Sequence, residues 1–201
     1  MPPAPPSPHP TLIMPITSIR SKIAARLYSW EARLNKQGQL AVYKLPPADG
    51  GGTFEVAGIN DRYHADKAWA LREMLARGKY DAAERAAKAY IADCTQVVTL
   101  WTRVPAIEAY LRDCAWNRGA KGALRILQLA LDVADDGKFG PVTKAALDEA
   151  MEFPDRLLLR LRYFREVYER RVAPPVGARA QFWPGLQRRW DAALEFAQGL
   201  L

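Results

Sequence analysis

The sequence has few of the residues that build metal centres or disulfide frameworks. Among its 201 residues are two cysteines, Cys94 and Cys114, and two histidines, His9 and His64. A disulfide scaffold needs more cysteines than this, and no spacing of histidine and cysteine is typical of zinc. We therefore predict no metal and no cofactor, and we expect both cysteines to be small buried apolar residues within helices.

Long hydrophobic runs are also lacking. No segment approaches the roughly 20 apolar residues that a transmembrane helix needs. Residues 1–17 are rich in proline and lack the basic stretch and continuous apolar run of a standard secretory signal. We predict a disordered Pro-rich arm over 1–17, and synthesis in the cytoplasm without a standard signal peptide.

Charge of one sign is in excess. The chain has 29 Lys and Arg against 22 Asp and Glu, a formal net charge of +7. This excess favours an anionic partner, and nucleic acid, a membrane surface and bacterial cell wall would each satisfy it. No nucleic-acid recognition motif is visible, so we expect no specific nucleic acid. Several arginines of the last 50 residues are predicted to form a basic helix face. The face is either an ordinary solvated surface or one that attracts the protein to an anionic envelope. These arginines are Arg156, Arg160, Arg162, Arg165, Arg170, Arg171, Arg188 and Arg189.

Helical periodicity dominates the pattern. The expected helices cover about 18–34, 66–77, 79–101, 104–116, 120–133, 140–151, 155–171 and 180–198. Two short runs, 40–45 and 53–57, are compatible with β-strands, and no strand is expected from Ala65 onward. The predicted fold class is mainly α with a small β-hairpin or sheet, an α+β arrangement.

Glu31 lies near the end of the first predicted helix, on the border of its apolar stripe and next to Trp30. A carboxyl group that is partly removed from water disfavours its ionised form, which suits a general acid. The alternative is an ordinary solvated helix glutamate. The loop after the first β-type run contains two prolines, Asp49 and three glycines, and glycines let a ligand approach the backbone closely.

These residues resemble the glycoside hydrolase family 108 muramidases. The family has Glu in an "EGGY" context, where this chain has Glu31 followed by Ala32-Arg33, and a "DPGGxTxxGI" element, which resembles residues 49–59 here. The segment 109–119 is similar to the family's "FDFAVNSG" helix, with Asn117 and Gly119 in the matching places. Residues 122–147 are similar to its peptidoglycan-binding module, and 182–194 to its terminal helix.

The resemblance implies a lysozyme-like architecture. Residues 18–117 would form the catalytic region, with a β-hairpin at about 40–58. Residues 118–201 would form a helical peptidoglycan-binding-like region packed on it as one compact unit. The implied activity is that of an N-acetylmuramidase (lysozyme) that cleaves the β-1,4 bond between N-acetylmuramic acid and N-acetylglucosamine. A bacteriolytic phage endolysin and a bacterial enzyme of wall remodelling would look alike in sequence. The alternatives are a lytic transglycosylase and a non-catalytic peptidoglycan-binding protein.

The predicted catalytic residues are Glu31, Asp49, Glu55 and Thr53. Glu31 is the acid, because glycoside hydrolysis needs protonation of the leaving oxygen, and the second carboxylate is Asp49 or Glu55. Counting from the glycines places the family threonine at Thr53, whereas counting back from Gly58-Ile59 places Glu55 there. The predicted substrate-binding residues are Tyr43, Gly51, Gly52, Asn60, Tyr63 and Asn117.

The expected partners are peptidoglycan glycan strands, which a monomer would reach in the cell wall or periplasm after release. Attraction to an anionic envelope would assist it. For each aromatic residue near the cleft, core packing is the alternative to sugar stacking. His64 is expected to be a loop or helix-start residue rather than a catalytic base.

Overall fold

The computed structural model describes residues 16–46 and 52–201. Its α-helices are α1 Ile16–Glu31, α2 Ala65–Ala76, α3 Tyr80–Cys94, α4 Pro105–Ala130, α5 Pro141–Ala150, α6 Pro154–Val172 and α7 Trp183–Gln198. The 3-10 helices include η2 Gln96–Leu100 and η3 Gly177–Phe182, and the strands are β1 Tyr43–Lys44, β2 Phe54–Val56 and β3 Ile59–Asn60. The predicted class, mainly α with a small β element, is confirmed. The predicted arm lies outside the described residues up to position 15, and α1 begins at Ile16.

Helix boundaries follow local chemistry. Pro105, Pro141 and Pro154 each open a helix, where proline costs nothing because the first backbone N–H has no partner inside the helix. The first helix ends at Glu31 and not near residue 34, because Leu34 instead forms an antiparallel bridge with Leu40. The helix expected over 79–101 is interrupted after Cys94 and continues as η2.

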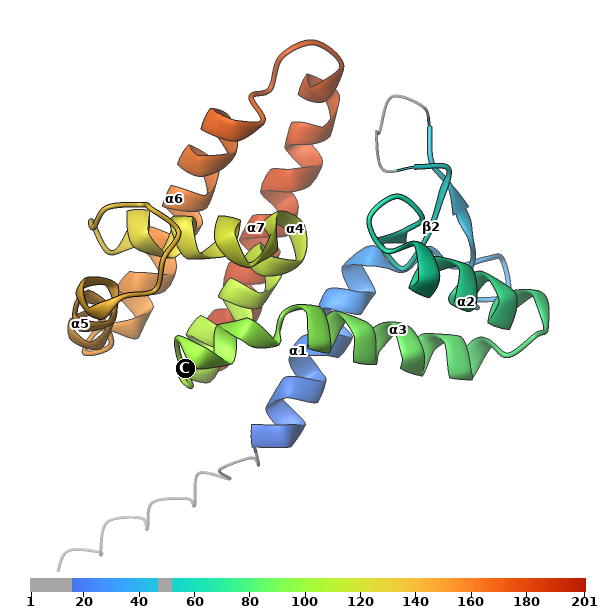
Figure 1. Ribbon diagram of the computed structural model, residues 1–201, viewed down its shortest axis with the longest axis horizontal. Helices are drawn as coiled ribbons and strands as arrows, with labels where there is room; N and C mark the ends of the chain where they lie inside the picture. The colour runs from blue at the N-terminus through green and yellow to red at the C-terminus, as the bar shows by residue number, and fades with distance from the viewer. Residues whose placement is uncertain (1–15, 47–51) are drawn as a thin grey trace, which may run out of the picture.

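Helix α4 is the central element (Figure 1). Its first half is buried almost all round, from Ala106 to Ala115. Gly119, with φ 66° and ψ 172°, interrupts the helical backbone, so α4 consists of two helices joined across a kink, which agrees with the helices expected over 104–116 and 120–133. In Figure 1, α2, α3 and the sheet lie on one side of the molecule and α5 on the other.

The small sheet has the order β1-β2-β3, with both neighbouring pairs antiparallel. The predicted pairing of the two β-type runs is confirmed. A third strand, β3, which the sequence analysis did not single out, follows β2 after a tight turn. Tyr43 pairs with Glu55, and Glu55 pairs with Asn60. Directly paired residues share a face, so these three side chains form a row across the sheet. Phe54 and Val56, which flank Glu55, are buried in the core.

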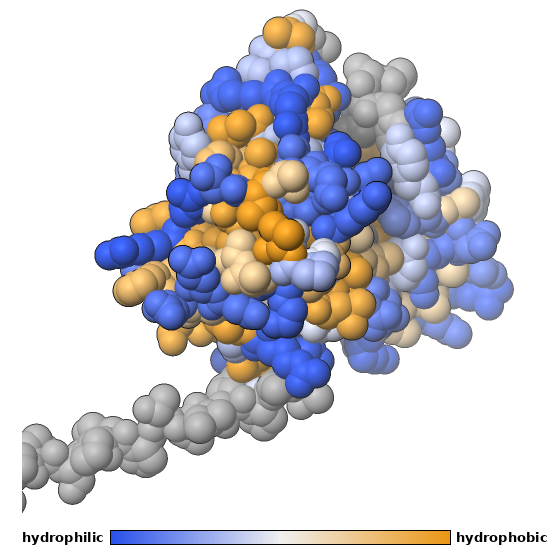
Figure 2. All heavy atoms as spheres, turned by 60° about the vertical axis from the view of Figure 1, so that its left-hand side comes forward, coloured by the Kyte–Doolittle hydropathy of each residue, from blue (hydrophilic) through white to orange (hydrophobic). Residues whose placement is uncertain are grey.

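The side of the molecule that carries α5 is mostly hydrophilic, with apolar patches between charged side chains (Figure 2). Over the described part of the chain, no helix combines the length and hydrophobicity needed to cross a bilayer.

The expectation of two buried cysteines was half right, because Cys114 is buried whereas Cys94 is exposed, and both are free thiols. Cys94 is exposed because it ends α3 at the surface, where the chain turns into η2.

Candidate functional site

Glu31 is the last residue of α1, and its carboxyl group lies between that helix, the sheet and α7. Arg189 of α7 donates a hydrogen bond from Nη1 to Glu31 Oε1 at 2.5 Å. The Glu31 side chain is 16% exposed. A Cβ atom placed on Gly58, in the turn between β2 and β3, would lie 2.5 Å from Glu31 Oε2. The carboxyl group therefore packs directly against the backbone of this turn.

Arg189 also binds Asp113, which is buried in α4. Its Nη2 and Nε lie 2.9 and 3.3 Å from Asp113 Oδ2. Arg165 of α6, fully buried, forms an ion pair with Asp113 Oδ1 at 2.7 Å. Four helices are thus joined by two arginines and two carboxylates, whose formal charges cancel. Arg165 and Arg189 do not belong to the solvated surface expected from the sequence, because both face carboxylates inside the helix bundle.

The pKa values of this cluster show that its charges are mutually compensated. Burial alone would raise the pKa of Asp113, but the charges of Arg189 and Arg165 and hydrogen bonds from both lower it to about 2. Burial disfavours the charged form of Arg189, yet Asp113 and Glu31 raise its pKa above the ordinary arginine value. Ion pairs among these four side chains fix Glu31 to α4, α6 and α7.

A hollow of about 780 Å³ has Gly58 in its wall. Gly58 also packs against the Glu31 carboxyl group, although Glu31 itself does not line the hollow. The hollow lies between the β2–β3 region and the middle of α4. Its lining residues are Gly58, Asn60, Tyr63, His64, Cys94, Ala115, Trp116, Asn117, Arg118 and Gly119. Three of the residues predicted to bind substrate, Asn60, Tyr63 and Asn117, therefore meet in one hollow, although Asn117 lies 54 positions after Tyr63.

Aromatic rings form one wall of the hollow. His64 stacks on Trp116 with centroids 6.0 Å apart and planes at 7°. Its Nδ1 lies 2.9 Å from the hydroxyl oxygen of Tyr90. Burial lowers the pKa of His64 below its usual value, so the ring is neutral at neutral pH. As expected, His64 directly precedes a helix, α2, and its ring supports the wall through Trp116 and Tyr90.

Arg118 brings a positive charge to this hollow, but that charge is already balanced. Its Nε donates to Glu169 Oε1 at 2.6 Å, and Glu169 is buried in α6. The wall near Gly119 is thus polar without a net charge. Flat rings beside amide side chains such as Asn60 and Asn117 suit a neutral polar polymer, because rings stack on sugar faces and amides bind hydroxyl and acetamido groups.

The remaining predicted residues are placed as follows. Thr53 is exposed and donates its hydroxyl hydrogen to Asp61 Oδ2 at 2.5 Å, with Gly52 just before it. Tyr43 is exposed, and the Arg33 Cζ atom lies over its ring, 5.2 Å from the ring centroid. Glu55 is half-buried between Tyr43 and Asn60 on the sheet. Asp49 and Gly51 lie outside the described residues.

Asp61 is a residue that the sequence analysis missed. Its Oδ1 accepts hydrogen bonds from the backbone N–H groups of Thr53 and Phe54. The hydrogen bond from the Thr53 hydroxyl, followed by the backbone bonds, lowers the pKa of Asp61. Because this hydroxyl is engaged by Asp61, Thr53 fixes the start of β2. A short polar residue that closes a hairpin was the sequence signal that could have identified it.

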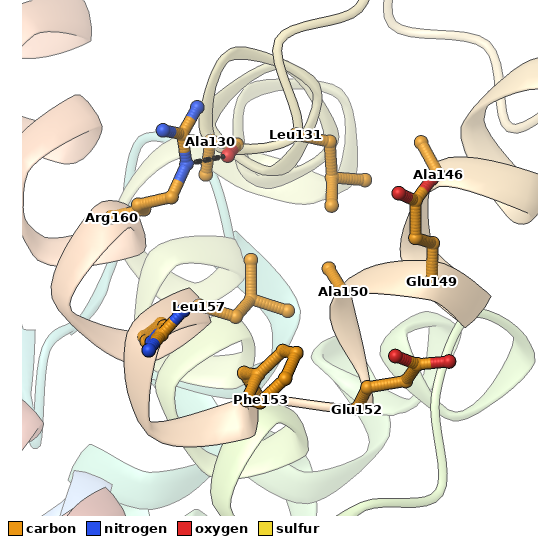
Figure 3. A pocket seen from close by; sticks show the side chains of 10 residues that line it. Ala130, Leu131, Ala146, Glu149, Ala150, Glu152, Phe153, Leu157 and Arg160 are labelled. Atoms are coloured by element: carbon orange, nitrogen blue, oxygen red, sulfur yellow. Dashed lines mark hydrogen bonds between the residues drawn. The ribbon is translucent and has the colours of Figure 1, made fainter.

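A different hollow, of about 330 Å³, lies between the end of α4, α5 and α6 (Figure 3). Leu131, Phe153 and Leu157 give it an apolar floor. Arg160 lies at its edge and donates a hydrogen bond from Nε to Ala130 O at 2.5 Å, which satisfies a carbonyl at the end of α4. None of the predicted catalytic or substrate-binding residues lines this hollow, whereas Arg156 and Arg160 of the predicted basic surface do.

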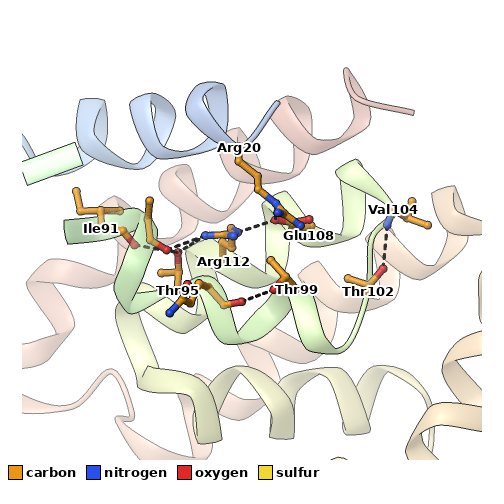
Figure 4. Close-up of polar contacts among 10 residues, drawn as sticks. Arg20, Ile91, Thr95, Thr99, Thr102, Val104, Glu108 and Arg112 are labelled. Carbon is orange, nitrogen blue, oxygen red and sulfur yellow. Dashed lines mark hydrogen bonds and ion pairs between the residues drawn. The ribbon is translucent and has the colours of Figure 1, made fainter. Parts of the chain in front are cut away.

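A second buried charged cluster joins α1, α3 and α4 (Figure 4). Glu108 Oε1 accepts from Arg112 Nε at 2.9 Å and from Arg20 Nε at 3.1 Å. Arg112 Nη1 also donates to Ala92 O and to Thr95 Oγ1, both at 2.9 Å. Burial lowers the pKa of Arg112, and Glu108 partly offsets this. All these partners are internal, so the cluster connects helices and offers nothing to a ligand.

In comparisons with known proteins, no family model and no curated protein matches the chain.

Proposed function

We propose that the protein is a peptidoglycan hydrolase, an N-acetylmuramidase in which Glu31 is the general acid. One observation carries the proposal: the Glu31 carboxyl group is held by Arg189 and packs against Gly58, where a hollow with a ring-and-amide wall begins. A glycan strand in the hollow would bring a glycosidic oxygen toward Glu31 Oε2, and a general acid at that position would protonate the leaving oxygen as the bond breaks.

Arg189 is a positioning residue in this mechanism. It binds Oε1 and leaves Oε2 beside Gly58. Because Arg189 is itself fixed by Asp113, the acid has a defined position relative to the hollow. A proton donor that is placed before substrate binds needs less reorganisation during the reaction.

Glu55 is the second carboxylate that we favour among the described residues. It pairs with Asn60 across the β2–β3 ladder, and Asn60 lines the hollow, so Glu55 emerges on the same face of the sheet. There it would stabilise an oxocarbenium-like centre or activate water. Thr53 lies outside this row, and Asp49, the other candidate, lies outside the described residues.

Peptidoglycan strands are the proposed substrate, and the cell wall or periplasm the proposed place of action. The resemblance to family 108 muramidases at Glu31, 49–59 and 109–119 supports this choice. The net charge of +7 supports attraction to an anionic envelope.

The test is the substitution Glu31→Gln, which keeps the shape of the side chain and an oxygen that can accept from Arg189. We expect clearance of cell-wall suspensions to fall by about 10²–10⁴-fold, the usual effect of losing a general acid. Glu73→Gln is the matched control, because Glu73 is an exposed glutamate near the end of α2 that is paired only with Arg77. Unchanged clearance in Glu31→Gln at an unchanged melting temperature would refute the proposal.

Mass spectrometry of the released fragments separates the alternatives. A hydrolase leaves a new reducing end, whereas a lytic transglycosylase leaves an anhydro sugar. A non-catalytic binding protein sediments with purified wall and releases neither product. The ion pair between Glu31 and Arg189 is also compatible with this last alternative, because it joins helices whether or not catalysis occurs.

A further inference from the structure

A further hollow, of about 430 Å³, lies near the kink of α4. Gly119 lines the hollow beside Gly58 and the next residue, Ala120, lines this one, so the chain passes from one hollow to the other at the kink. The second hollow has an apolar floor and charged side chains around it. Its lining residues are Val97, Trp101, Ala120, Lys121, Leu124, Asp136, Gly137, Lys138 and Phe139.

The floor is a pair of stacked rings. Trp101 follows η2 and Phe139 precedes α5, with centroids 6.2 Å apart and planes at 25°. Both are half-buried, so each keeps part of its surface accessible. Val97 and Leu124 extend this surface. Small aliphatic groups would be well accommodated here, because they lose contact with water on binding.

Lys121 and Lys138 contribute positive charge, and neither forms an ion pair with any other residue that the structure describes. The stem of Lys121 packs on Gly137, where an added Cβ would lie 2.9 Å from its Cγ. This contact holds the Lys121 side chain beside the turn that carries Lys138. The two ammonium groups can therefore bind the same anionic ligand.

Asp136 gives the hollow one negative charge. Its Oδ1 accepts from Gln128 Nε2 at 2.8 Å and from the Lys138 backbone N–H at 2.9 Å. The hydrogen bond from Lys138, followed by that from Gln128, lowers the pKa of Asp136, so the group is ionised. Gln128 is buried and also accepts from the Gly137 N–H at 2.8 Å, which fixes the turn. The charges are thus arranged before a ligand arrives.

We propose that this second hollow binds the peptide stem of peptidoglycan, a short net-anionic peptide that carries one amine. Stem carboxylates would pair with Lys121 and Lys138, the amine with Asp136, and the alanine methyl groups would lie on Trp101 and Phe139. A phosphate polymer fits less well, since it has no apolar groups for the rings and Asp136 repels it. The inference rests on the proposed function, because the glycan in the first hollow would direct its stem across the kink.

Titration calorimetry with a synthetic stem tetrapeptide of alanine, glutamate and a diamino acid tests the inference. We expect saturable binding by the full chain. The double variant Lys121→Ala/Lys138→Ala should bind about three- to tenfold more weakly, the combined effect of two partly exposed ion pairs. Asp136→Asn should weaken binding of this peptide but not of an analogue that lacks the amine. Lys79→Ala/Lys144→Ala is the matched control, because both lysines are exposed and neither lines this hollow.

Absence of saturable binding, or equal affinity in the double lysine variant, would overturn the inference. So would equal competition by inorganic phosphate, which would indicate a general anion site. The binding measurement needs no cleavage, so its outcome is separate from that of Glu31→Gln. If Glu31→Gln abolishes clearance while the tetrapeptide does not bind, only this inference fails.

Discussion

Gly58 has two separate reasons to be glycine. Its φ of +72° lies in the left-handed region, where a side chain costs about 1–2 kcal/mol. In addition, a Cβ atom would come within 2.5 Å of Glu31 Oε2. Gly38 shares the first reason but not the second, because its φ is +76° and nothing lies within 4 Å of its Cβ position. Substitutions of Gly58 and Gly38 can therefore distinguish the effect of backbone strain from the effect of displacing the Glu31 carboxyl group.

We expect Gly58→Ala and Gly38→Ala to lose a similar stability from backbone strain, about 1–2 kcal/mol each. Gly58→Ala should also displace the Glu31 carboxyl group and lower wall clearance by at least about tenfold, whereas Gly38→Ala should leave clearance close to wild type. Chemical denaturation and a clearance assay at a temperature where both variants are folded measure the two effects. Equal clearance by the two variants would contradict the placement of Glu31.

At the scale of helices, Asp113 joins α4 to α6 and α7 through Arg165 and Arg189. Removal of one partner of a buried ion pair leaves an uncompensated charge in the interior and typically costs about 3–5 kcal/mol. Asp113→Asn should therefore lower the free energy of unfolding by about that amount. Asp148→Asn is the control, because its pair with Lys144 is exposed and contributes less than about 1 kcal/mol. Urea denaturation of both variants at pH 7 provides the comparison.

The same carboxylate predicts how stability depends on pH. The pKa of Asp113 is about 2 in the folded protein, below its ordinary value of 3.8, because Arg189 and Arg165 outweigh the opposite effect of burial. A lowered pKa contributes stability that is fully present above the unfolded value and is lost as pH falls toward 2, about 2 kcal/mol in all. The stability difference between wild type and Asp113→Asn should therefore shrink between about pH 4 and pH 2. A constant difference over that range would contradict the ionised state of Asp113.

The sequence predicted the elements better than their contacts. The helices, including those that begin at a proline, lie close to their predicted positions, because the pattern that predicts a helix depends on the local spacing of apolar residues. The ion pair of Glu31 with Arg189 spans 158 positions, and no pattern near either residue indicates it. The same holds for Asp113, which reads as one more polar residue of an amphipathic helix. Buried charge pairs are determined by tertiary packing, so they appear only in the structure.

Within the candidate site, residues that the sequence analysis expected near a cleft come together. Asn60 and Tyr63 follow the start of β3, and Asn117 lies 54 positions after Tyr63, yet all three line the hollow. Counting along the sequence left open whether Thr53 or Glu55 occupies the threonine position of the family. The structure adds that Glu55 lies in a row with Asn60, whereas the Thr53 hydroxyl is hydrogen-bonded to Asp61.

For the whole molecule, the net charge of +7 predicts how binding to the cell wall responds to salt. The screening length falls from about 10 Å at 0.1 M salt to about 3 Å at 1 M. Attraction between exposed charges of the protein and an anionic wall should therefore weaken strongly over this range. Buried pairs such as those of Asp113 are screened much less, so the fold should persist. We expect the fraction that sediments with purified wall to fall several-fold, with unchanged circular dichroism.

The source of this effect can be tested by removing charge far from both hollows. Lys79→Gln/Lys144→Gln replaces two exposed lysines and lowers the net charge from +7 to +5. If the field of the whole protein drives attraction, this variant should bind wall more weakly at low salt and as well as wild type at high salt, because screening removes the difference. A neutral soluble glycan should bind both proteins equally at every salt concentration. If wild-type binding to wall does not respond to salt, attraction arises within the hollows rather than from the field of the molecule.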